Sequence, residues 1–168
     1  MNAIFGLSEL AGEPMMRRES HEFIHGSVKS NDKMKLKEEI KELLKKHEEI
    51  LVAYLYGSIV KGYGGKESDI DVGLLLKEDF ETEALYPARI AGEIKKKCSL
   101  KQEVDVRILN KGSYRFLHQV IKEGEVILST NERERVRFET SVIDRYIYFK
   151  PFYKQYDEKR RERLLACA

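Results

Sequence analysis

The residues best suited to chemistry lie in the segment 56–76, YGSIVKGYGGKESDIDVGLLL, in which two aspartates flank one isoleucine. Asp69 and Asp71 are two positions apart, and residues i and i+2 of a strand point to the same face of a sheet. Carboxylates on one face repel each other and raise each other's pKa unless a cation lies between them. Mg²⁺ prefers carboxylate oxygens, commonly together with substrate phosphates. The spacing therefore predicts a divalent-cation site.

A third acidic residue belongs to the same hypothesis. Asp105 lies in the segment 102–109, QEVDVRIL, where apolar and charged residues alternate as they do in a half-buried strand. If this strand pairs beside the one that carries Asp71, the third carboxylate joins the other two. Two divalent ions about 3.5–4 Å apart can hold both the attacking and the leaving oxygen of a phosphoryl displacement. Asp69, Asp71 and Asp105 are therefore the candidate metal ligands and catalytic residues.

The glycine-rich loop before the aspartates could hold phosphates. Gly57 lets the backbone approach a phosphate closely, and Ser58 can begin a helix, whose free N–H groups attract anions. Lys61 adds a mobile cation to the same loop. The segment thus supplies a phosphate cradle and a metal pair within one turn-and-strand unit.

The remaining pattern describes the elements that must position these residues. Short apolar runs predict strands at 51–57, 69–76, 102–109 and 125–129. Helical periodicity predicts helices at 34–50, 79–98 (with Pro87 limiting its start), 112–124, 131–149 (with Asn131 as N-cap) and, after Pro151, 152–166. We therefore expect an α+β fold: a small mixed β-sheet with flanking helices, plus a helical C-terminal tail. The expected divisions are a poorly patterned extension (1–33), a catalytic domain (34–130) and the tail (131–168), a candidate partner interface.

Composition narrows the class of protein. Lysine and arginine (31) nearly balance aspartate and glutamate (29), so the net charge is only +2 and we expect no direct nucleic-acid binding. No apolar run is long enough to cross a bilayer, and the N-terminal residues do not have the pattern of a secretory signal. The two cysteines, Cys98 and Cys167, show no paired spacing, which favours a reduced cytoplasmic protein.

At these residues the chain resembles the DNA polymerase β-type nucleotidyltransferase superfamily, and within it the minimal nucleotidyltransferase (MNT) branch. The resemblance rests on Gly57-Ser58, ten further residues, and then the Asp-x-Asp pair preceded by Ser68. Asp105 matches the third acidic position, and the similarity extends over residues 34–128. The chain departs from the pattern at Ile59 and Lys61, where many members carry arginine.

The resemblance implies the nucleotidyltransferase fold and a role for each candidate residue. Gly57, Ser58, Lys61 and Ser68 would form the nucleotide-binding set. Asp69 and Asp71 would ligate two Mg²⁺ ions, and Asp105 would ligate the catalytic ion and help to deprotonate the attacking hydroxyl.

The same resemblance implies a partner. MNT proteins are typically paired with a small helical HEPN-domain protein, which in several pairs is an RNase toxin. The MNT protein, an MntA-like type VII antitoxin, transfers AMP from ATP to a tyrosine of the toxin. We therefore expect a protein adenylyltransferase with ATP as substrate and a HEPN toxin as partner, in a homo- or hetero-oligomer.

Three other interpretations remain open. The chain could modify a small molecule of the aminoglycoside type, with the acceptor site at a homodimer interface, or it could neutralise its partner by contact alone. The segment HEFIH at residues 21–25 matches the H-E-x-x-H pattern of zinc proteases. Gly26 follows at once and no third ligand is evident, so a chance match is the better interpretation.

Overall fold

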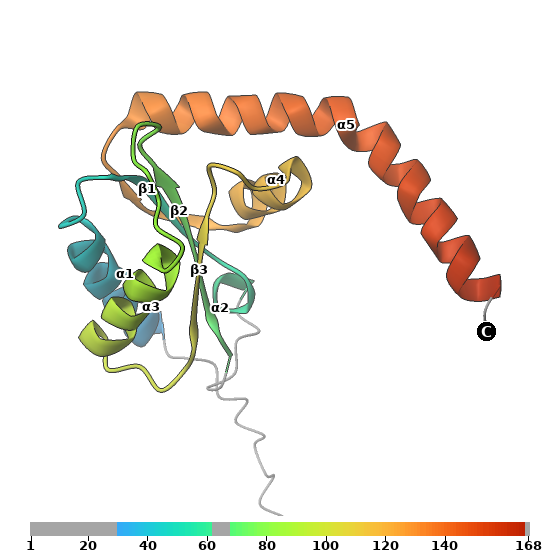
Figure 1. The fold of residues 1–168 in the computed structure, drawn as a ribbon. Coiled ribbons are helices and arrows are strands. Elements are labelled where there is room, and N and C mark those ends of the chain that lie inside the picture. The colour runs from blue at the N-terminus through green and yellow to red at the C-terminus, as the bar shows by residue number, and fades with distance from the viewer. Residues whose placement is uncertain (1–29, 62–67, 167–168) are drawn as a thin grey trace, which may run out of the picture.

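A four-stranded β-sheet forms the centre of the fold (Figure 1). Its strands are β1 (Ile50–Tyr56), β2 (Ile70–Leu76), β3 (Val104–Ile108) and β4 (Glu125–Ser129), in the order β3-β2-β1-β4. β1 pairs antiparallel with β2 and with β4, whereas β2 pairs parallel with β3. The mixed sheet confirms the predicted α+β fold. The structure is a computed structural model that describes residues 30–61 and 68–166, and the HEFIH segment lies outside these residues.

Helices cover both faces of this sheet. They are α1 (Ser30–Leu44), α2 (Ser58–Lys61), α3 (Tyr86–Lys97), α4 (Tyr114–Glu123) and α5 (Glu132–Ala166). α1 and α3 pack on one face, while α4 and the first part of α5 lie on the other (Figure 1). α3 lies in the connection between the parallel strands β2 and β3, which require a crossover of this kind. Pro87 lies in the first turn of α3 and limits its start as predicted, but residues 79–85 of the expected helix are not helical.

Alternation along the strands gives the sheet two packed faces. Ile70 and Val72 are at most 1% exposed and belong to the core beneath α1 and α3, as predicted. Val52 and Tyr54 belong to the core on the opposite face, beneath α4 and α5. Because successive side chains of a strand point to opposite faces, Asp71 lies on the α4 side.

The C-terminal tail differs from the prediction. We expected Pro151 to separate two helices, but α5 is one helix of 35 residues with the proline inside it. Contacts on both sides of the proline explain this, because Tyr146 stacks on His118 and Asp157 pairs with Arg115, and both partners belong to α4. The helix changes direction along its course (Figure 1), as a proline without an N–H donor would cause. No helix in the described chain combines the length and apolar character needed to cross a membrane.

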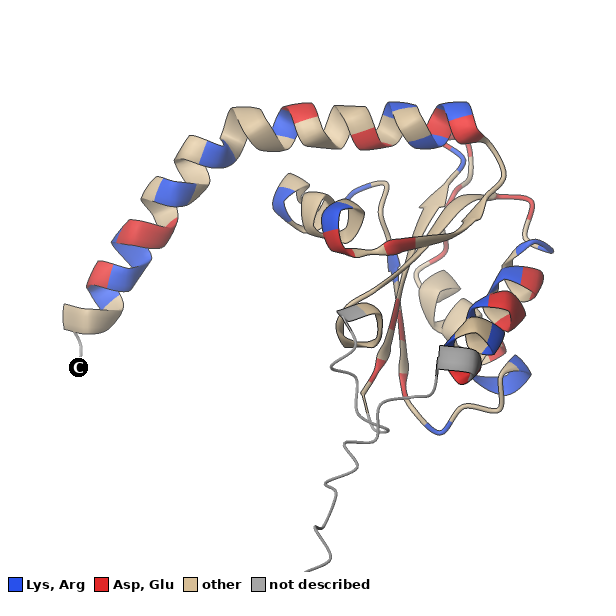
Figure 2. Ribbon diagram, turned by 180° about the vertical axis from the view of Figure 1, so that it is seen from behind, with Lys and Arg blue, Asp and Glu red and all other residues tan. Residues whose placement is uncertain are grey.

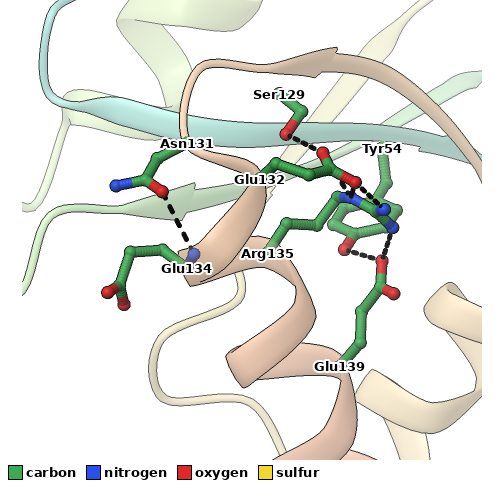
Figure 3. Close-up of polar contacts among 7 residues, drawn as sticks. All are labelled: Tyr54, Ser129, Asn131, Glu132, Glu134, Arg135 and Glu139. Atoms are coloured by element: carbon green, nitrogen blue, oxygen red, sulfur yellow. Dashed lines mark hydrogen bonds and ion pairs between the residues drawn. The ribbon is translucent and has the colours of Figure 1, made fainter.

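Polar contacts fix the start of α5 to the sheet (Figure 3). The backbone N–H of Glu134 donates to Asn131 Oδ1 at 3.2 Å, which confirms the predicted N-cap. The hydroxyl of Tyr54 on β1 donates to Glu139 Oε1 at 2.8 Å, and Arg135 Nη1 donates to the same oxygen at 2.7 Å (Figure 3). β1 and α5 are therefore joined by a hydrogen-bonded network on the face that also carries Asp71.

Candidate active site

Two of the three predicted carboxylates are direct neighbours across the sheet. In the parallel pairing of β2 with β3, the Cα partner of Asp71 is Asp105. This confirms that the strand containing Asp105 lies beside the strand containing Asp71, on the same face. Asp69 is exposed and stands one residue before β2. The sheet thus brings Asp71 and Asp105 together, with Asp69 at the edge of the pair.

The electrostatics of Asp71 reflect this crowding. Its pKa is raised above the ordinary value, first by burial and then by the negative charges of Asp105 and Asp69. The positive charge of Arg107 acts in the opposite direction and lowers the pKa. Asp71 is therefore a carboxylate whose ionised form the protein stabilises poorly, and a bound cation would relieve that penalty.

The predicted glycine lies directly against this carboxylate. Gly57 has a φ of +75°, and a β-carbon built on it would lie 1.9 Å from Oδ2 of Asp71. Only glycine fits this position, because any side chain would overlap the carboxylate and the backbone conformation is left-handed. The turn after β1 and the first residues of β2 therefore meet at the site, as the resemblance implied.

The other predicted binding residues lie next to Gly57 and the Asp-x-Asp pair in the chain. Ser58 begins the short helix α2, and Lys61 ends it; the Lys61 side chain is outside the described part of the structure. Ile59, at a departure from the family pattern, packs against the apolar core beneath α1 and α3. Ser68 is partly buried beside Asp69. The roles of Ser58, Lys61 and Ser68 toward a nucleotide remain predictions.

Arg107 is a site residue to which we assigned no role from the sequence. Its Nε donates to Asp105 Oδ2 at 2.9 Å, and its guanidinium lies 5.4 Å from the centre of the Phe116 ring. It is two residues after Asp105 on β3 and so shares its face. The two-residue spacing of Asp105 and Arg107 was the feature of the sequence that could have identified Arg107 as a site residue. In the described structure, Arg107 supplies the positive charge that neighbouring carboxylates need.

Tyr56 is a second residue that sequence reasoning missed. It is the last residue of β1, and its Cα partner on β2 is Asp71. Its hydroxyl is buried and has no hydrogen-bond partner among the described residues. Burial raises the pKa of Tyr56 to about 12, while the ring makes an edge contact with Phe116 at 5.8 Å. Its place directly before Gly57 was visible in the sequence, but we interpreted it only as the end of a strand.

The carboxylates fit Mg²⁺ in chemistry, although the described side chains do not form a complete cluster. Among residues 30–61 and 68–166, no three His, Cys, Asp or Glu side chains are placed so that they could hold a metal ion together. Asp71 and Asp105 are nevertheless adjacent hard oxygen ligands, and the raised pKa of Asp71 marks a place where positive charge is favourable. The pair is therefore suited to a hard divalent cation.

Comparison with solved structures places the fold. A chain in a crystal structure of a toxin-antitoxin with AMP-PNP superimposes with a TM-score of 0.65 and 20% identity, over 74% of this chain and 98% of that one. A tri-AMPylated Shewanella oneidensis HEPN toxin in complex with MNT antitoxin contains a chain with a TM-score of 0.62 and 18% identity, over 77% and 98%. The toxin-antitoxin MntA-HepT gives a TM-score of 0.61 and 18% identity, over 76% and 98%. At such identities the similarity shows the fold.

Sequence comparison identifies the family. A search of curated proteins gave no match. The family described as Polymerase beta, Nucleotidyltransferase matches residues 38–133, which is more than half of the chain. This range contains the Gly-Ser turn, both aspartates of the Asp-x-Asp pair and Asp105. The chain therefore belongs to the polymerase β nucleotidyltransferase family.

Proposed function

We propose that this protein is a Mg²⁺-dependent adenylyltransferase that transfers AMP from ATP to a tyrosine of a HEPN-domain toxin and so acts as its antitoxin. The observation that carries the proposal is the close packing of the Gly57 backbone on Asp71, with Asp105 as the neighbour of Asp71 in the sheet. Membership of the nucleotidyltransferase family supports the reaction class. Shared fold with chains from toxin-antitoxin complexes supports the partner.

The chemistry assigns a task to each residue of the site. Asp71 and Asp105, with Asp69, would hold Mg²⁺, which when bound stabilises the negative charge of a transferring phosphoryl group. The Gly57 backbone would let the phosphate chain approach the carboxylates. The acceptor oxygen forms a bond to the α-phosphorus of ATP, the bond to the β-phosphate bridging oxygen breaks, and pyrophosphate leaves. Asp105 would accept the proton of the attacking hydroxyl. Positioning and charge stabilisation supply most of such catalysis.

A surface of α5 supports a protein as the acceptor. Tyr148, Phe152 and Tyr156 are each at least 59% exposed, and their spacing of four residues puts them along one side of the helix. We call these three residues the α5 ridge. Exposed apolar patches mark interaction sites, and aromatic residues are enriched in the energetic centres of protein interfaces. The ridge therefore supports an interface with another protein chain.

Basic residues outnumber acidic ones in the distal half of α5, mostly after the last residue of the ridge. In residues 154–166, Figure 2 shows Lys and Arg positions interrupted by fewer acidic ones, five against three in the sequence. The basic residues are Lys154, Lys159, Arg160, Arg161 and Arg163. Opposite charges on a partner steer association and fix orientation. The ridge therefore fits an apolar groove with an acidic border on the toxin.

The test is transfer of label from ATP that is labelled at the α-phosphate. The purified protein is incubated with Mg²⁺ and a co-expressed HEPN toxin, and transfer is measured by gel and by a mass shift of one AMP on the toxin. We expect labelled toxin with the wild type and none with the Asp69→Asn/Asp71→Asn variant. Asp79→Asn removes an exposed carboxylate outside the site and should retain transfer. Label on an aminoglycoside without any toxin would instead establish a small-molecule transferase.

A second function, neutralisation by binding alone, is favoured by one observation. Arg107 already pairs with Asp105 at 2.9 Å, so the described site balances part of its charge without a metal ion. If the toxin is bound and inhibited equally by the wild type and by Asp69→Asn/Asp71→Asn, and neither labels it, binding is the function. Inhibition that is lost together with transfer supports the adenylyltransferase.

A further inference from the structure

The hydroxyl of Tyr56 is the one buried side-chain polar atom in the described chain that has no hydrogen-bond partner. Buried polar groups are nearly always paired, because leaving one unpaired costs free energy. A tyrosine at this position could be replaced by phenylalanine without loss of packing. The hydroxyl therefore calls for an explanation outside the internal contacts of these residues.

The surroundings of this hydroxyl are those of the acidic site. Tyr56 faces Asp71 across the β1–β2 pairing, and Asp105 and Arg107 on β3 act on it electrostatically. The edge contact with Phe116 holds its ring against α4. Tyr56 therefore lies beside the carboxylates to which the proposed function assigns the metal ion and the phosphates, and aromatic packing holds its ring there.

The type of missing partner follows from the chemistry of the hydroxyl. A tyrosine hydroxyl is protonated at neutral pH, so the Tyr56 hydroxyl is available as a donor. The two nearby carboxylates are acceptors, yet neither accepts a hydrogen bond from it in the described structure. A metal-bound water is a poor acceptor because its lone pair points at the metal. An anionic oxygen that arrives from outside is the matching group.

We propose that the Tyr56 hydroxyl donates a hydrogen bond to a phosphate oxygen of the nucleotide, which makes Tyr56 a substrate-binding residue of this site. This inference rests on the proposed function, because it requires a nucleotide beside Asp71. Entry of the phosphate requires surface side chains to move, and Arg107 is suited to do so. Its ion pair with Asp105 joins side chains that are 56% and 44% exposed, and such pairs hold weakly. Arg107 would then supply a second donor to the same phosphate.

Tyr54 provides a matched control on the same strand. It lies two residues before Tyr56 and points to the same face, but its hydroxyl donates to Glu139 at 2.8 Å (Figure 3). The variants Tyr56→Phe and Tyr54→Phe each delete a single oxygen atom from a tyrosine of β1. Only Tyr56→Phe deletes an oxygen that has no hydrogen-bond partner within the described residues.

The experiment measures two properties of wild type, Tyr56→Phe and Tyr54→Phe in the full chain: the thermal midpoint without nucleotide, and the Kd for AMP-PNP with Mg²⁺. For Tyr56→Phe we expect an unchanged or higher midpoint and a Kd about tenfold weaker, as for loss of one charge-assisted hydrogen bond. For Tyr54→Phe we expect a lower midpoint and an unchanged Kd, because an internal hydrogen bond is lost.

Each other outcome overturns the inference. A Kd of Tyr56→Phe equal to that of the wild type would show that the hydroxyl does not contact the nucleotide, while the proposed function would stand. A lowered midpoint of Tyr56→Phe without nucleotide would reveal an internal partner for the hydroxyl. If the wild type itself binds no AMP-PNP with Mg²⁺, the proposed function fails, and the role of Tyr56 fails with it.

Discussion

A β-carbon on Gly57 would lie 1.9 Å from Oδ2 of Asp71 and 2.9 Å from its carboxyl carbon. The end of β1 therefore touches the start of β2 through a backbone that has no room for a side chain. The φ of +75° at Gly57 gives a second, independent reason for glycine. The Asp71 carboxylate can therefore occupy its position only because residue 57, fourteen residues earlier in the chain, has no side chain.

Replacing Gly57 by alanine should damage both stability and the site. The left-handed conformation alone costs an L-residue about 1–2 kcal/mol, and the overlap with Asp71 must displace the carboxylate. We expect the free energy of unfolding in urea to fall by at least that amount. Affinity for AMP-PNP with Mg²⁺ should fall with it.

Gly92 provides the control for this substitution. It is exposed within α3, and no heavy atom lies within 4 Å of a β-carbon built on it. Gly92→Ala should therefore raise stability by about 0.5–1 kcal/mol through helix propensity. A Gly57→Ala protein as stable as Gly92→Ala, with unchanged nucleotide affinity, would contradict the contact between Gly57 and Asp71.

The raised pKa of Asp71 predicts a pH-dependent gain from Asp71→Asn. The folded protein binds this proton more tightly than the unfolded chain does, whose ordinary value is 3.8. Ionised Asp71 therefore destabilises the folded state above its raised pKa, and this penalty disappears as the pH falls toward the ordinary value. Without metal, Asp71→Asn should be more stable than the wild type at neutral pH. The difference should shrink as urea denaturation is repeated at lower pH.

The cause of the raised pKa of Asp71 can be tested with the same urea denaturation measurements. Burial is its largest cause, and Asp105 is the next. In an Asp105→Asn background, the gain from Asp71→Asn at neutral pH should be smaller but not zero. Burial remains, while the repulsion from Asp105 is gone and Arg107 loses its pair with Asp105. An equal gain in both backgrounds would show that the two carboxylates do not interact, despite their pairing in the sheet.

The faces on which Asp71 and Asp105 lie could be predicted from the sequence because they depend on the two-residue period of a strand, whereas their adjacency was conditional on the pairing of β2 with β3. That period put Ile70 and Val72 in the core and Asp71 on the opposite face, and it also put Arg107 beside Asp105. The unpaired hydroxyl of Tyr56 could not be predicted. It depends on what Phe116 and the neighbouring strands place around one atom, and no periodicity encodes that arrangement.

The course of α5 also could not be predicted from the sequence. A proline inside a helical pattern indicates a break, because it removes one hydrogen bond and collides with a preceding carbonyl. In the structure, tertiary contacts outweigh this local cost, since α4 holds Tyr146 before the proline and Asp157 after it. Those contacts join segments about thirty or more residues apart in the sequence, as with Arg115 and Asp157. Local propensity could not reveal them.

The network between β1 and α5 predicts a non-additive pair of substitutions. Glu139→Ala should leave the hydroxyl of Tyr54, which is 1% exposed, without its acceptor at a cost of about 1–3 kcal/mol. Tyr54→Phe in the same chain removes the orphaned hydroxyl, so the double variant should be less destabilised than the sum of the single variants. Urea denaturation of the four proteins measures the coupling.

Two features help to interpret this double-mutant cycle. Glu139 also accepts from Arg135 at 2.7 Å, so Tyr54→Phe alone leaves the carboxylate paired and should cost less than Glu139→Ala. Arg133→Ala, at an exposed neighbouring position of α5, should change stability by less than about 0.5 kcal/mol. Strict additivity of Tyr54→Phe and Glu139→Ala would mean that the hydrogen bond between them contributes nothing to the fold.

The α5 ridge makes a prediction that separates binding from folding. Phe152 is 59% exposed and Tyr156 is 65% exposed, so truncating either to alanine should change the free energy of unfolding by less than about 0.5 kcal/mol. If the ridge enters an apolar groove of the toxin, each truncation should weaken binding about tenfold or more, as for an interface anchor. Calorimetric titration of the toxin measures the Kd.

Phe149 provides a control for which we expect a larger effect on stability and a smaller effect on toxin binding. It lies between the residues of the ridge in sequence, but its ring stacks on Tyr114 of α4 with centres 6.1 Å apart. Phe149→Ala should lower stability by roughly 1–3 kcal/mol, below the about 3–5 kcal/mol of a fully buried phenylalanine. Because Phe149 faces α4, its truncation should weaken toxin binding less than Phe152→Ala does. If Phe152→Ala and Tyr156→Ala leave the toxin Kd unchanged, the toxin does not bind the ridge, and the exposed aromatic residues of α5 must serve another partner.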